Sequence, residues 1–387
     1  MIAVVGGGIM GALSAFVAAR MDAVEWWAPA EQPQRDDGAQ ARAYALAPQT
    51  MELLKELGIW SALADKAQPV SAMQVFHVQP AAQVDLLAAD AGLDALAHIV
   101  VHADLLAACE QATSYAPNLV RKGAYLPPDP LACDPSVACP AGAQLTIAAD
   151  GKDSRLRRAA GILYSRRDYD QMALVMAFQT EQPHGGMACQ WFRPEGILAL
   201  LPLNHPHQVS MVYSLPTAQA LQLKDRPLSD LAERITQDSE HRFGVLTPAS
   251  QTCQAAALAM TRAERMTSGR LALVGDAAHT VHPLAGYGLN LGVQDLLALR
   301  QVLQAEQSTH AKAFDPGHRR VLQAYAKNRQ SQVPQVQWGL DILWRVVMGE
   351  TPGLAGGRSL GMQTVQSLPM LRKWLVGSAL AGRAVPF

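Results

Sequence analysis

Two stretches of the chain place glycines beside groups that could bind a cofactor, and the first lies at residues 271–292. It reads LALVGDAAHTVHPLAGYGLNLG, in which a short apolar run ends at Asp276 and a glycine-rich loop follows. A carboxylate at the end of a strand can accept a hydrogen bond from a sugar hydroxyl. The loop can offer backbone N–H groups to an anion, and its glycines let the backbone lie close to a flat ring. The pattern therefore predicts one wall of a cofactor site.

The second stretch is the N-terminal sequence VVGGGIMG, where Gly6, Gly8 and Gly11 match G-x-G-x-x-G. The first glycine permits a tight turn, the second lets a pyrophosphate approach the backbone, and the third lets a helix pack closely on a strand. The triplet is a weak signal alone, but it stands between an apolar run at 2–5 and a helical composition at 12–20. This context favours dinucleotide binding over a merely tight turn.

A third stretch, AADGKDSRLRRAAG, contains Asp150, Gly151, Ser154 and Arg157 in the pattern D-G-x-x-S-x-x-R. Asp-Gly is good turn chemistry and a serine can cap a helix, so these residues also fit an ordinary strand-to-helix turn. The two interpretations are compatible, and the glycine-rich stretches on either side favour an additional cofactor role.

His279 and His282 form a His-x-x-His pair that invites a metal interpretation. No third ligand with suitable spacing is nearby and Pro283 follows directly, so we expect no metal site. A histidine acting as catalytic base is a minor alternative.

Composition excludes several classes of protein. The 387 residues are 49% hydrophobic and 17% charged, an ordinary globular balance without a signature of disorder. Lys and Arg total 32 against 33 Asp and Glu, which argues against a nucleic-acid partner. The cysteines are scattered, and we expect reduced thiols. No stretch of about 20 residues is apolar enough to span a bilayer. We therefore expect a cytoplasmic protein that is soluble or, at most, peripheral to the inner face of the membrane.

The three stretches carry a family resemblance. In this order and spacing, GGGIMG, ADGKDSRLR and GDAAHTVHPLAGYGLNLG resemble the class A flavoprotein monooxygenases, the group of para-hydroxybenzoate hydroxylase. Residues 41–60 and 169–203, together with the HPLAG loop, are similar to the ubiquinone-biosynthesis hydroxylase branch of that family. The resemblance covers nearly the whole chain.

The resemblance and the pattern of predicted elements agree on an α/β fold. Short apolar runs around turns predict a doubly wound nucleotide-binding domain, and several strands at 171–216 predict an antiparallel sheet that interrupts it. The resemblance implies that the first domain is a Rossmann-like FAD-binding domain of the GR2 type. Helices are expected at the C-terminus. The expected boundaries are FAD-binding segments at 1–70, 99–165 and 262–310, substrate-domain strands at 71–98, a substrate-domain antiparallel sheet at 166–261, and a C-terminal helical region at 311–387.

The resemblance also implies site residues. Gly6, Gly8 and Gly11 would take the ADP pyrophosphate of FAD, and Arg42 stands where the family has an arginine near the flavin. The remaining cofactor positions are Asp150 and Gly151 beside the FAD, Asp276 at the ribityl chain, and Pro283, Gly286, Gly288, Leu289 and Asn290 along the isoalloxazine ring. The substrate would lie between the flavin and the antiparallel sheet, near Gln190, Phe192, Leu201 and Pro283.

The implied reaction is hydroxylation of a phenolic ring. NAD(P)H would reduce the flavin, O2 would add to give a flavin C4a-hydroperoxide, and the electron-rich ring would take the distal oxygen. The flavin carries this chemistry, so no catalytic side chain is assigned. The implied substrate is a polyprenylated phenol of ubiquinone biosynthesis. Arg372, Lys373 and Trp374 in an apolar C-terminal region mildly favour a lipidic substrate and a membrane surface, although a packed terminal helix is the more ordinary explanation. Peripheral membrane or biosynthetic-complex association is therefore a further expectation.

Three positions depart from the family pattern. The acid expected after the second strand falls at Ala28, with Glu25 as the nearest carboxylate; Ala103 stands where an arginine is usual; and Tyr287 replaces a glutamine. Losing two charged hydrogen bonds of about 1.5–3 kcal/mol each would weaken FAD binding by roughly 10²–10⁴ unless something compensates. Two alternatives therefore stay open: a hydroxylase of a small soluble aromatic acid, and a degenerate flavoprotein serving as a scaffold in a quinone-biosynthesis complex.

Overall fold

A parallel sheet forms the frame of the first half of the molecule. The computed structural model describes residues 1–29, 41–78, 82–128, 139–282 and 286–348, with side chains of the last helix described as far as residue 337. The sheet has the order β16-β17-β9-β1-β2-β8, and all its pairs are parallel except β16 with β17. Its strands are β1 (Ile2–Val5), β2 (Val24–Trp27), β8 (Leu119–Lys122), β9 (Leu145–Ala148), β16 (Thr267–Ser268) and β17 (Leu271–Leu273).

The sequence explains why this sheet is buried on both sides. Strands β1, β9 and β17 consist of apolar residues and one threonine, and every residue in them is buried. Such continuous burial is typical of a parallel sheet covered by helices. Helix α1 (Ile9–Ala19) packs on β1 and β2 and against α3 (His102–Ser114) and α7 (Tyr287–Thr309).

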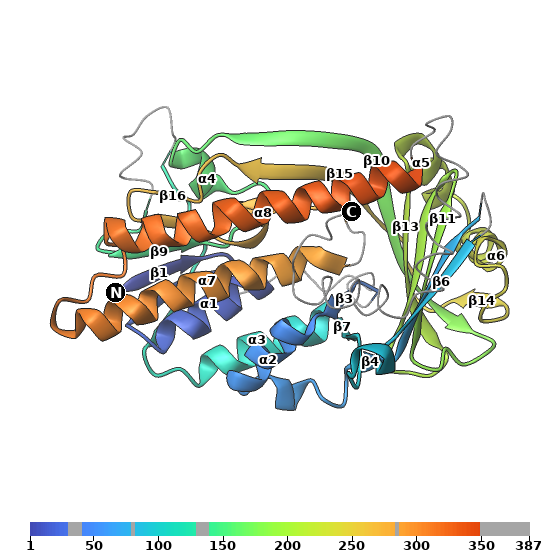
Figure 1. Cartoon of the computed structure of the whole chain (residues 1–387), viewed down its shortest axis with the longest axis horizontal. Helices are drawn as coiled ribbons and strands as arrows, with labels where there is room; N and C mark the ends of the chain where they lie inside the picture. The colour runs from blue at the N-terminus through green and yellow to red at the C-terminus, as the bar shows by residue number, and fades with distance from the viewer. Residues whose placement is uncertain (30–40, 79–81, 129–138, 283–285, 349–387) are drawn as a thin grey trace.

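A second sheet forms the other half of the molecule (Figure 1). Its order is β18-β15-β10-β13-β12-β11-β5-β6, and β14 pairs with β10. The strands are β5 (Ala72–His77), β6 (Ala82–Leu87), β10 (Tyr164–Thr180), β11 (Met187–Arg193), β12 (Gly196–Pro202), β13 (Gln208–Pro216), β14 (Leu246–Pro248), β15 (Gln254–Ala263) and β18 (His279–Thr280). The sheet is antiparallel, as predicted, except where β5 runs parallel to β11.

The two faces of the second sheet have different neighbours. One face packs under α5 (Thr217–Lys224) and α6 (Leu228–Asp238), in a core that includes Trp191, Tyr213 and Ile235. The opposite face contacts the first half of the molecule, where Ala177, Ala188 and Leu203 cluster with residues of a small sheet. That sheet consists of β3 (Ala43–Leu46), β7 (Ala97–Val101) and β4 (Gln68–Val70).

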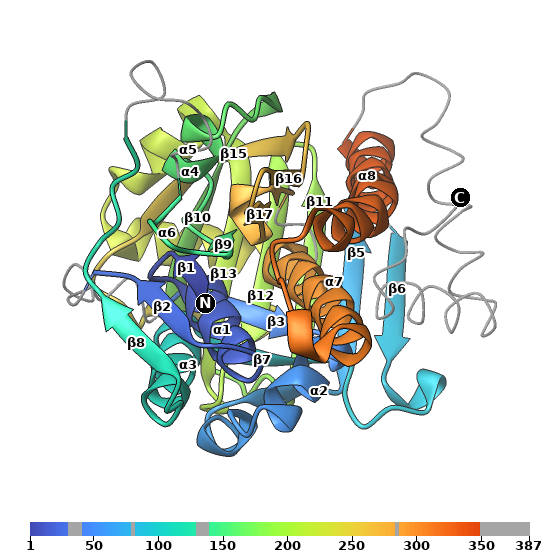
Figure 2. The same ribbon diagram turned by 90° about the vertical axis from the view of Figure 1, so that its left-hand side faces the viewer.

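Long elements join the two halves. Strand β10 starts beside the parallel sheet and ends in the second sheet, with β15 paired along much of it (Figure 1). Helices α7 and α8 (Arg319–Met348) pack against each other and run across the molecule in opposite directions (Figures 1 and 2). The described residues also form the α-helices α2 (Pro48–Glu56) and α4 (Arg155–Ala159) and four short 3-10 helices, at Trp60–Ala62, Ala89–Ala91, Gly275–Ala277 and Ala311–Ala313.

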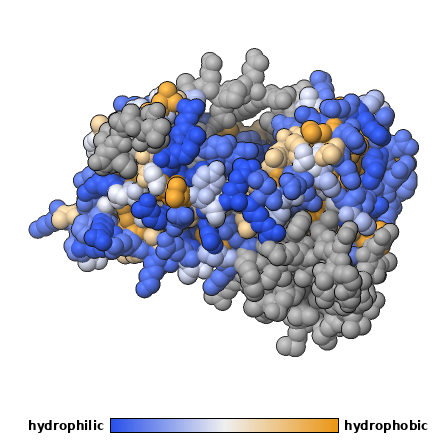
Figure 3. Space-filling model, turned by 90° about the horizontal axis from the view of Figure 1, so that it is seen from above, coloured by the Kyte–Doolittle hydropathy of each residue, from blue (hydrophilic) through white to orange (hydrophobic). Residues whose placement is uncertain are grey.

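This architecture confirms the predicted fold class. A Rossmann-like parallel sheet, an antiparallel sheet and C-terminal helices are all present. The exact division into domain segments stays a prediction, and the expected helix near 360–381 lies outside the described residues. Within the described part of the chain no helix is both long and apolar enough to cross a membrane. The face seen from above is mostly hydrophilic, with apolar residues in small groups (Figure 3).

A buried polar network fastens α6 to the second sheet. The Tyr213 hydroxyl, in β13, donates a hydrogen bond of 2.8 Å to Oδ2 of Asp238 at the end of α6. The same oxygen accepts a bond of 2.6 Å from Nε of Arg234, and Arg193 donates to the Asp238 carbonyl oxygen at 2.9 Å. Burial raises the pKa of Tyr213, and the neighbouring Asp238 carboxylate adds to the effect, so this phenol stays protonated and remains a donor.

We expect Tyr213→Phe to lower the free energy of unfolding by about 1–3 kcal/mol, because the buried Asp238 carboxylate loses a donor. Urea unfolding followed by circular dichroism measures the change. Tyr115→Phe is the matched control, since Tyr115 is 76% exposed and its hydroxyl can be solvated. Equal effects from the two substitutions would show that the buried hydrogen bond does not stabilise the fold.

Candidate cofactor site at the carboxyl edge of the parallel sheet

The predicted cofactor residues follow strands that run in the same direction. Strands β1, β9 and β17 are mutually parallel neighbours, with Val5 paired to Ala148 and Leu273 paired to the same alanine. Their carboxyl ends therefore meet at one edge of the sheet, where open α/β sheets bind ligands. Gly6, Asp150 and Asp276, which are far apart in sequence, come together at this edge.

The N-terminal glycines have three different environments. Gly6 has φ +139°, and a Cβ there would lie 2.1 Å from the Ala149 carbonyl oxygen. A Cβ at Gly11 would lie 1.9 Å from the Gly6 carbonyl oxygen, so α1 packs on this turn only because residue 11 lacks a side chain. At Gly8 a Cβ would meet nothing within 4 Å. The turn and the close packing thus explain Gly6 and Gly11, whereas Gly8 borders open space at the start of α1.

The Asp150 loop is both a helix cap and an open polar site. Oδ2 of Asp150 accepts hydrogen bonds from the backbone N–H groups of Arg155 (2.8 Å) and Leu156 (3.2 Å), and Ser154 caps α4 by accepting from Arg157 N at 3.0 Å. The strand-to-helix turn anticipated from the sequence is therefore present, with Gly151 at φ +83°. Oδ1 of Asp150 is buried without a protein partner, which leaves one acceptor for a ligand hydroxyl.

Arg157 connects two of the three stretches, a role that the sequence pattern did not reveal. Its side chain is buried and donates to the Ala277 carbonyl oxygen at 2.8 Å and to the Lys152 carbonyl oxygen at 3.0 Å. The guanidinium also lies over the Tyr164 ring, 4.3 Å from its centroid. Arg157 therefore fixes the Asp150 loop against the turn that carries Asp276.

A fully buried charge network fixes the same turn from the other side. Asp295, in α7, is completely buried, and its Oδ2 accepts from Gly275 N (2.9 Å) and lies 2.7 Å from Nε2 of His279. Its Oδ1 accepts from Nε of Arg329, in α8, at 2.7 Å. Burial alone would raise the pKa of the Asp295 carboxyl, but His279, Arg329 and the Gly275 N–H outweigh it and hold that pKa below its usual range. Neither Asp295 nor Arg329 was singled out from the sequence, because each pairs only in the folded chain.

Asp276 lies in a polar cluster contributed by three segments. Its side chain is exposed on one side. Desolvation by the surrounding atoms raises the pKa of the Asp276 carboxyl, although the charges of His279, Arg42 and Lys152 lower it in part. The Arg42 guanidinium lies 5.2 Å from the centroid of the Tyr44 ring. Desolvation and the charge of Arg42 lower the pKa of His102 to about 4, so this histidine is neutral at pH 7.

Tyr44 and His102 are therefore site neighbours that sequence reasoning missed. The Tyr44 hydroxyl lies 3.2 Å from Nδ1 of His102, and the His102 backbone N–H donates to the Arg42 carbonyl oxygen at 2.7 Å. The only sequence signal was the position of His102 directly before Ala103, one of the three departures from the family pattern.

The start of α7 faces the same region. Gly286 has φ +63°, and a Cβ there would meet Ala45 Cβ at 3.2 Å, whereas a Cβ at Gly288 would meet nothing within 4 Å. Leu289 packs against the core of the first half. The Asn290 amide accepts from Ala47 N (3.0 Å) and Thr50 Oγ1 (2.8 Å) and donates to Ala45 O (2.8 Å), so it pins α7 to the segment after β3. Pro283 lies outside the described residues.

The departure at Ala28 is not offset by the nearest carboxylate. Ala28 is fully buried directly after β2, and Glu25 forms an ion pair of 3.5 Å with Lys122 on the neighbouring strand β8. Trp27 precedes Ala28, and its indole Nε1 is buried without a protein partner. This N–H lies one residue before the position where the family pattern expects an acid, and it can donate a hydrogen bond to a ligand there.

The histidine pair does not form a metal centre in the described part of the chain, which contains no group of three potential ligands. His279 is committed to Asp295. Burial lowers the pKa of His282 to about 4, and its Nε2 lies 3.3 Å from Oε1 of Gln171.

The predicted substrate residues share one face of the second sheet. Gln190 and Phe192 alternate with Trp191 along β11, so they point away from the core under α6. Leu201, in β12, lies on the same face and packs against the same apolar cluster as Ala43 and Ala45 of β3. The sheet therefore presents these residues toward the half of the molecule that carries the cofactor residues, although contact with a substrate stays a prediction.

Comparisons with known proteins agree with this geometry. Residues 140–337 match the model of a family described as FAD binding domain. The chain is 31% identical to the 3-demethoxyubiquinol 3-hydroxylase of Escherichia coli (strain K12), over 98% of both chains. It is 28% identical to the ubiquinone hydroxylase UbiL of Rhodospirillum rubrum, over 98% of this chain and 89% of the relative.

Solved structures share the fold at low sequence identity. The p-nitrophenol 4-monooxygenase PnpA from Pseudomonas putida DLL-E4 superposes with a TM-score of 0.76 at 17% identity, covering 99% of this chain and 98% of that one. At this identity the likeness concerns the fold alone.

The residues at the carboxyl edge fit FAD. The open space at Gly8 lies at the N-terminus of an 11-residue helix, where backbone N–H groups favour a pyrophosphate. Trp27 Nε1 and Asp150 Oδ1 are a buried donor and a buried acceptor without protein partners, as a ligand rich in hydroxyl groups requires. The exposed side of Asp276 and the open side of Gly288 lie on the elements that the resemblance assigns to the flavin.

We expect Gly8→Ala and Gly11→Ala to separate cofactor binding from folding. The open space at Gly8 allows the apo protein to keep nearly its full stability, but the new methyl group would weaken FAD binding by about tenfold or more. Gly11→Ala should lower the free energy of unfolding by about 1–3 kcal/mol, because its Cβ overlaps backbone. Urea unfolding and FAD titration measure the two effects. A Gly8→Ala variant that binds FAD as tightly as the wild type would contradict the assignment.

We expect Asp295→Asn to destabilise the protein by about 3–5 kcal/mol at pH 7, since it leaves Arg329 buried beside a neutral group. The folded-state pKa of Asp295 lies below the unfolded value of about 4, so the wild-type advantage is full above pH ~4 and is lost as pH falls through the folded-state pKa. Denaturant unfolding at pH 3–7 follows the difference between the two proteins. Asp94→Asn, at an exposed aspartate, is the control and should show no such difference. A difference in unfolding free energy between the wild type and Asp295→Asn that stays constant down to pH 3 would contradict an ionised Asp295 carboxylate.

Proposed function

The chain belongs to the FAD-binding family of flavin-dependent monooxygenases, and from this membership we propose that it hydroxylates a polyprenylated phenol of ubiquinone biosynthesis. Such an enzyme uses FAD as cofactor and NAD(P)H as co-substrate. The observation that carries the proposed substrate is the similarity to two hydroxylases named for ubiquinone or its precursor, over nearly the full length of the chain.

Each cluster at the carboxyl edge has a distinct proposed role. FAD would supply the redox and oxygen chemistry. The α1 N-terminus at Gly8 would bind the pyrophosphate, and the free Oδ1 of Asp150 would accept from a hydroxyl group of the cofactor. Arg157 binds the backbone after Asp276, at Ala277, and Asp295 binds the backbone before it, at Gly275. The Asp276 carboxylate, positioned in this way, would accept a hydrogen bond from the ribityl chain. The positive charge of Arg42 lies where the family has an arginine near the flavin.

The substrate would bind between this edge and the second sheet. The face that carries Gln190, Phe192 and Leu201 is built largely from small or apolar side chains, among them Ala173, Ala177, Ala199, Ser210 and Ser214. Small side chains leave room for a ring, and apolar walls exclude water from the reacting atoms. The buried Gln190 amide could orient a phenol hydroxyl or a ring substituent. Pro283 would complete the flavin side of this site.

The two alternatives differ in measurable ways. A hydroxylase of a soluble aromatic acid would need a cation for the carboxylate. Such a hydroxylase would not need the peripheral membrane contact or complex partner that we expect for an enzyme with a prenylated substrate. A scaffold protein would not need to bind FAD at all. Full-length similarity to named hydroxylases of ubiquinone or its precursor favours hydroxylation of a polyprenylated phenol over both alternatives.

We expect the purified protein to retain FAD through desalting and to convert a short-chain prenylated phenol to a hydroxylated product with consumption of NAD(P)H and O2. Mass spectrometry of the product and absorbance of the flavin measure both steps. Asp276→Ala should lower flavin retention and product formation together, since both depend on the same site. Turnover of a hydroxybenzoate with none of the prenylated phenol would instead establish the soluble-substrate function. A folded protein that takes up no FAD would contradict the hydroxylase function and favour the scaffold function.

A further inference from the structure

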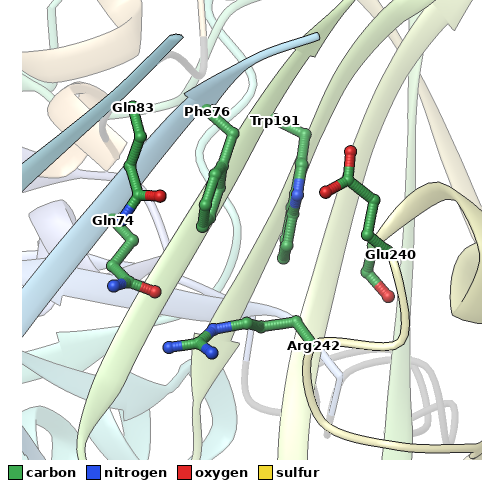
Figure 4. A pocket seen from close by; sticks show the side chains of 7 residues that line it. Gln74, Phe76, Gln83, Trp191, Glu240 and Arg242 are labelled. Carbon is green, nitrogen blue, oxygen red and sulfur yellow. The ribbon is translucent and has the colours of Figure 1, made fainter. Parts of the chain in front are cut away.

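A cavity of about 230 Å³ lies on the α6 side of the second sheet, away from the carboxyl edge. Side chains from β5, β6, β11 and the loop after α6 surround it, among them Gln74, Phe76, Trp191 and Arg242 (Figure 4). Phe76 and Trp191 alternate along their strands with Val75 and Gln190, so they point to the opposite face of the sheet. The sheet itself therefore separates this cavity from the proposed substrate face.

One wall of the cavity is aromatic. The rings of Phe76 and Trp191 stack with their centroids 5.2 Å apart and their planes 12° from parallel. Trp191 is 1% exposed and anchors the wall in the core, while Phe76 is only partly buried and is the ring that a ligand can reach. An aromatic ring held in this way favours stacking or edge contact with a second flat ring.

The other walls carry polar side chains, namely the exposed Arg242 and Glu240 and the partly buried Gln74. The Arg242 side chain runs beneath the two rings toward Gln74 (Figure 4), and its Nη2 lies 3.3 Å from the sulfur of Met187, a weak acceptor. Oε1 of Gln74 is buried without a hydrogen-bond partner. The Arg242 side chain is exposed, so its guanidinium is solvated and can bind an incoming carboxylate through charged hydrogen bonds. An unpaired buried carbonyl oxygen favours an O–H or N–H donor.

The loop that presents Arg242 follows directly after α6. Glu240 and His241 have φ of +53° and +54°, a left-handed conformation that non-glycine residues rarely adopt. The loop is held at both ends: Asp238 is bonded to Tyr213 and Arg234, and the Val245 backbone N–H donates to Glu181 Oε2 at 2.9 Å. These φ values belong to the C-terminal cap of α6, in which the His241 N–H donates to the Thr236 carbonyl oxygen and the Glu240 N–H to the Gln237 carbonyl oxygen, both at 2.9 Å. The cap fixes the direction in which the chain leaves α6 and so the position of Arg242.

We propose that this cavity is a second binding site, outside the flavin site, for a small aromatic carboxylate that carries a hydroxyl or amino group. The carboxylate binds Arg242, the ring packs on Phe76, and the ring substituent donates to Gln74. A cavity of about 230 Å³ accommodates one substituted ring. Binding at this site does not require the reaction at the flavin. A failed hydroxylation assay would therefore not contradict the second site, and a failed binding test would not contradict the proposed function.

Calorimetric titration of the FAD-loaded protein with benzoate and its three amino isomers tests this proposal. At least one aminobenzoate should bind with a dissociation constant of about 1 mM or lower, and benzoate should bind several-fold more weakly. Quenching of tryptophan fluorescence should accompany binding because Trp191 lines the cavity. The flavin absorbance spectrum should not change, since the sheet separates the two sites.

Two variants assign the binding to the cavity. Arg242→Gln should weaken binding at least about tenfold, because it removes the charged hydrogen bond. Gln74→Met should abolish the preference for aminobenzoate over benzoate. Arg226→Gln is the matched control, since Arg226 is also exposed and lies in the turn before α6, outside the cavity. Thermal unfolding verifies that all three variants fold.

The proposal is overturned if neither benzoate nor any aminobenzoate binds at concentrations up to about 10 mM, because the binding free energy would then be too small for a specific site. It is also overturned if Arg242→Gln binds like the wild type, or if the ligand shifts the flavin spectrum, because either result would assign the ligand to the flavin site. Loss of binding in Arg242→Gln, with an unchanged flavin spectrum and normal binding by Arg226→Gln, supports it.

Discussion

The geometry of the cofactor edge depends on one buried carboxylate. Asp295 is fully buried in α7 and binds the Gly275 backbone, His279 and Arg329. Burying a charge is costly unless charged and polar partners surround it, so this carboxylate is stable only when α7, α8 and the turn after β17 are all in place. The network therefore couples assembly of the C-terminal helices to the position of Asp276. Arg157 fixes the other side of the same turn through Ala277.

The parallel sheet determines which residues can meet at that edge. Strands β1, β9 and β17 belong to segments separated by more than a hundred residues, yet their parallel pairing brings the three following loops together. Glycines then set how closely the loops approach. Gly6, Gly11 and Gly292 each lie against backbone atoms of another segment or turn, whereas Gly8 and Gly288 border open space. The first group keeps the loops packed, and the second leaves room for a cofactor against the backbone.

The second sheet uses its two faces for different purposes. The alternation of side chains along β11 sends Gln190 and Phe192 toward the first half of the molecule and Trp191 toward α6. One face carries small or apolar residues around Gln190, and we propose that it faces a ring held beside the flavin. The other face ends in a polar cavity beside the C-terminal cap of α6, where Arg242 is exposed and Oε1 of Gln74 is buried without a hydrogen-bond partner. A single strand thus contributes to two separate surfaces.

The sequence by itself determined the fold class, the family and the glycine-rich segments of the cofactor edge, because strand periodicity and turn chemistry are local properties of the chain. It also located the departures at Ala28, Ala103 and Tyr287, but not what surrounds them. Only the tertiary structure showed that Glu25 pairs with Lys122 and leaves the Trp27 indole N–H without a partner. The Asp295 network, the Arg157 bridge and the cluster of Arg42, Tyr44 and His102 were invisible for the same reason. Each joins residues from segments that no local pattern connects, and burial changes their hydrogen bonding and protonation only after the chain has folded.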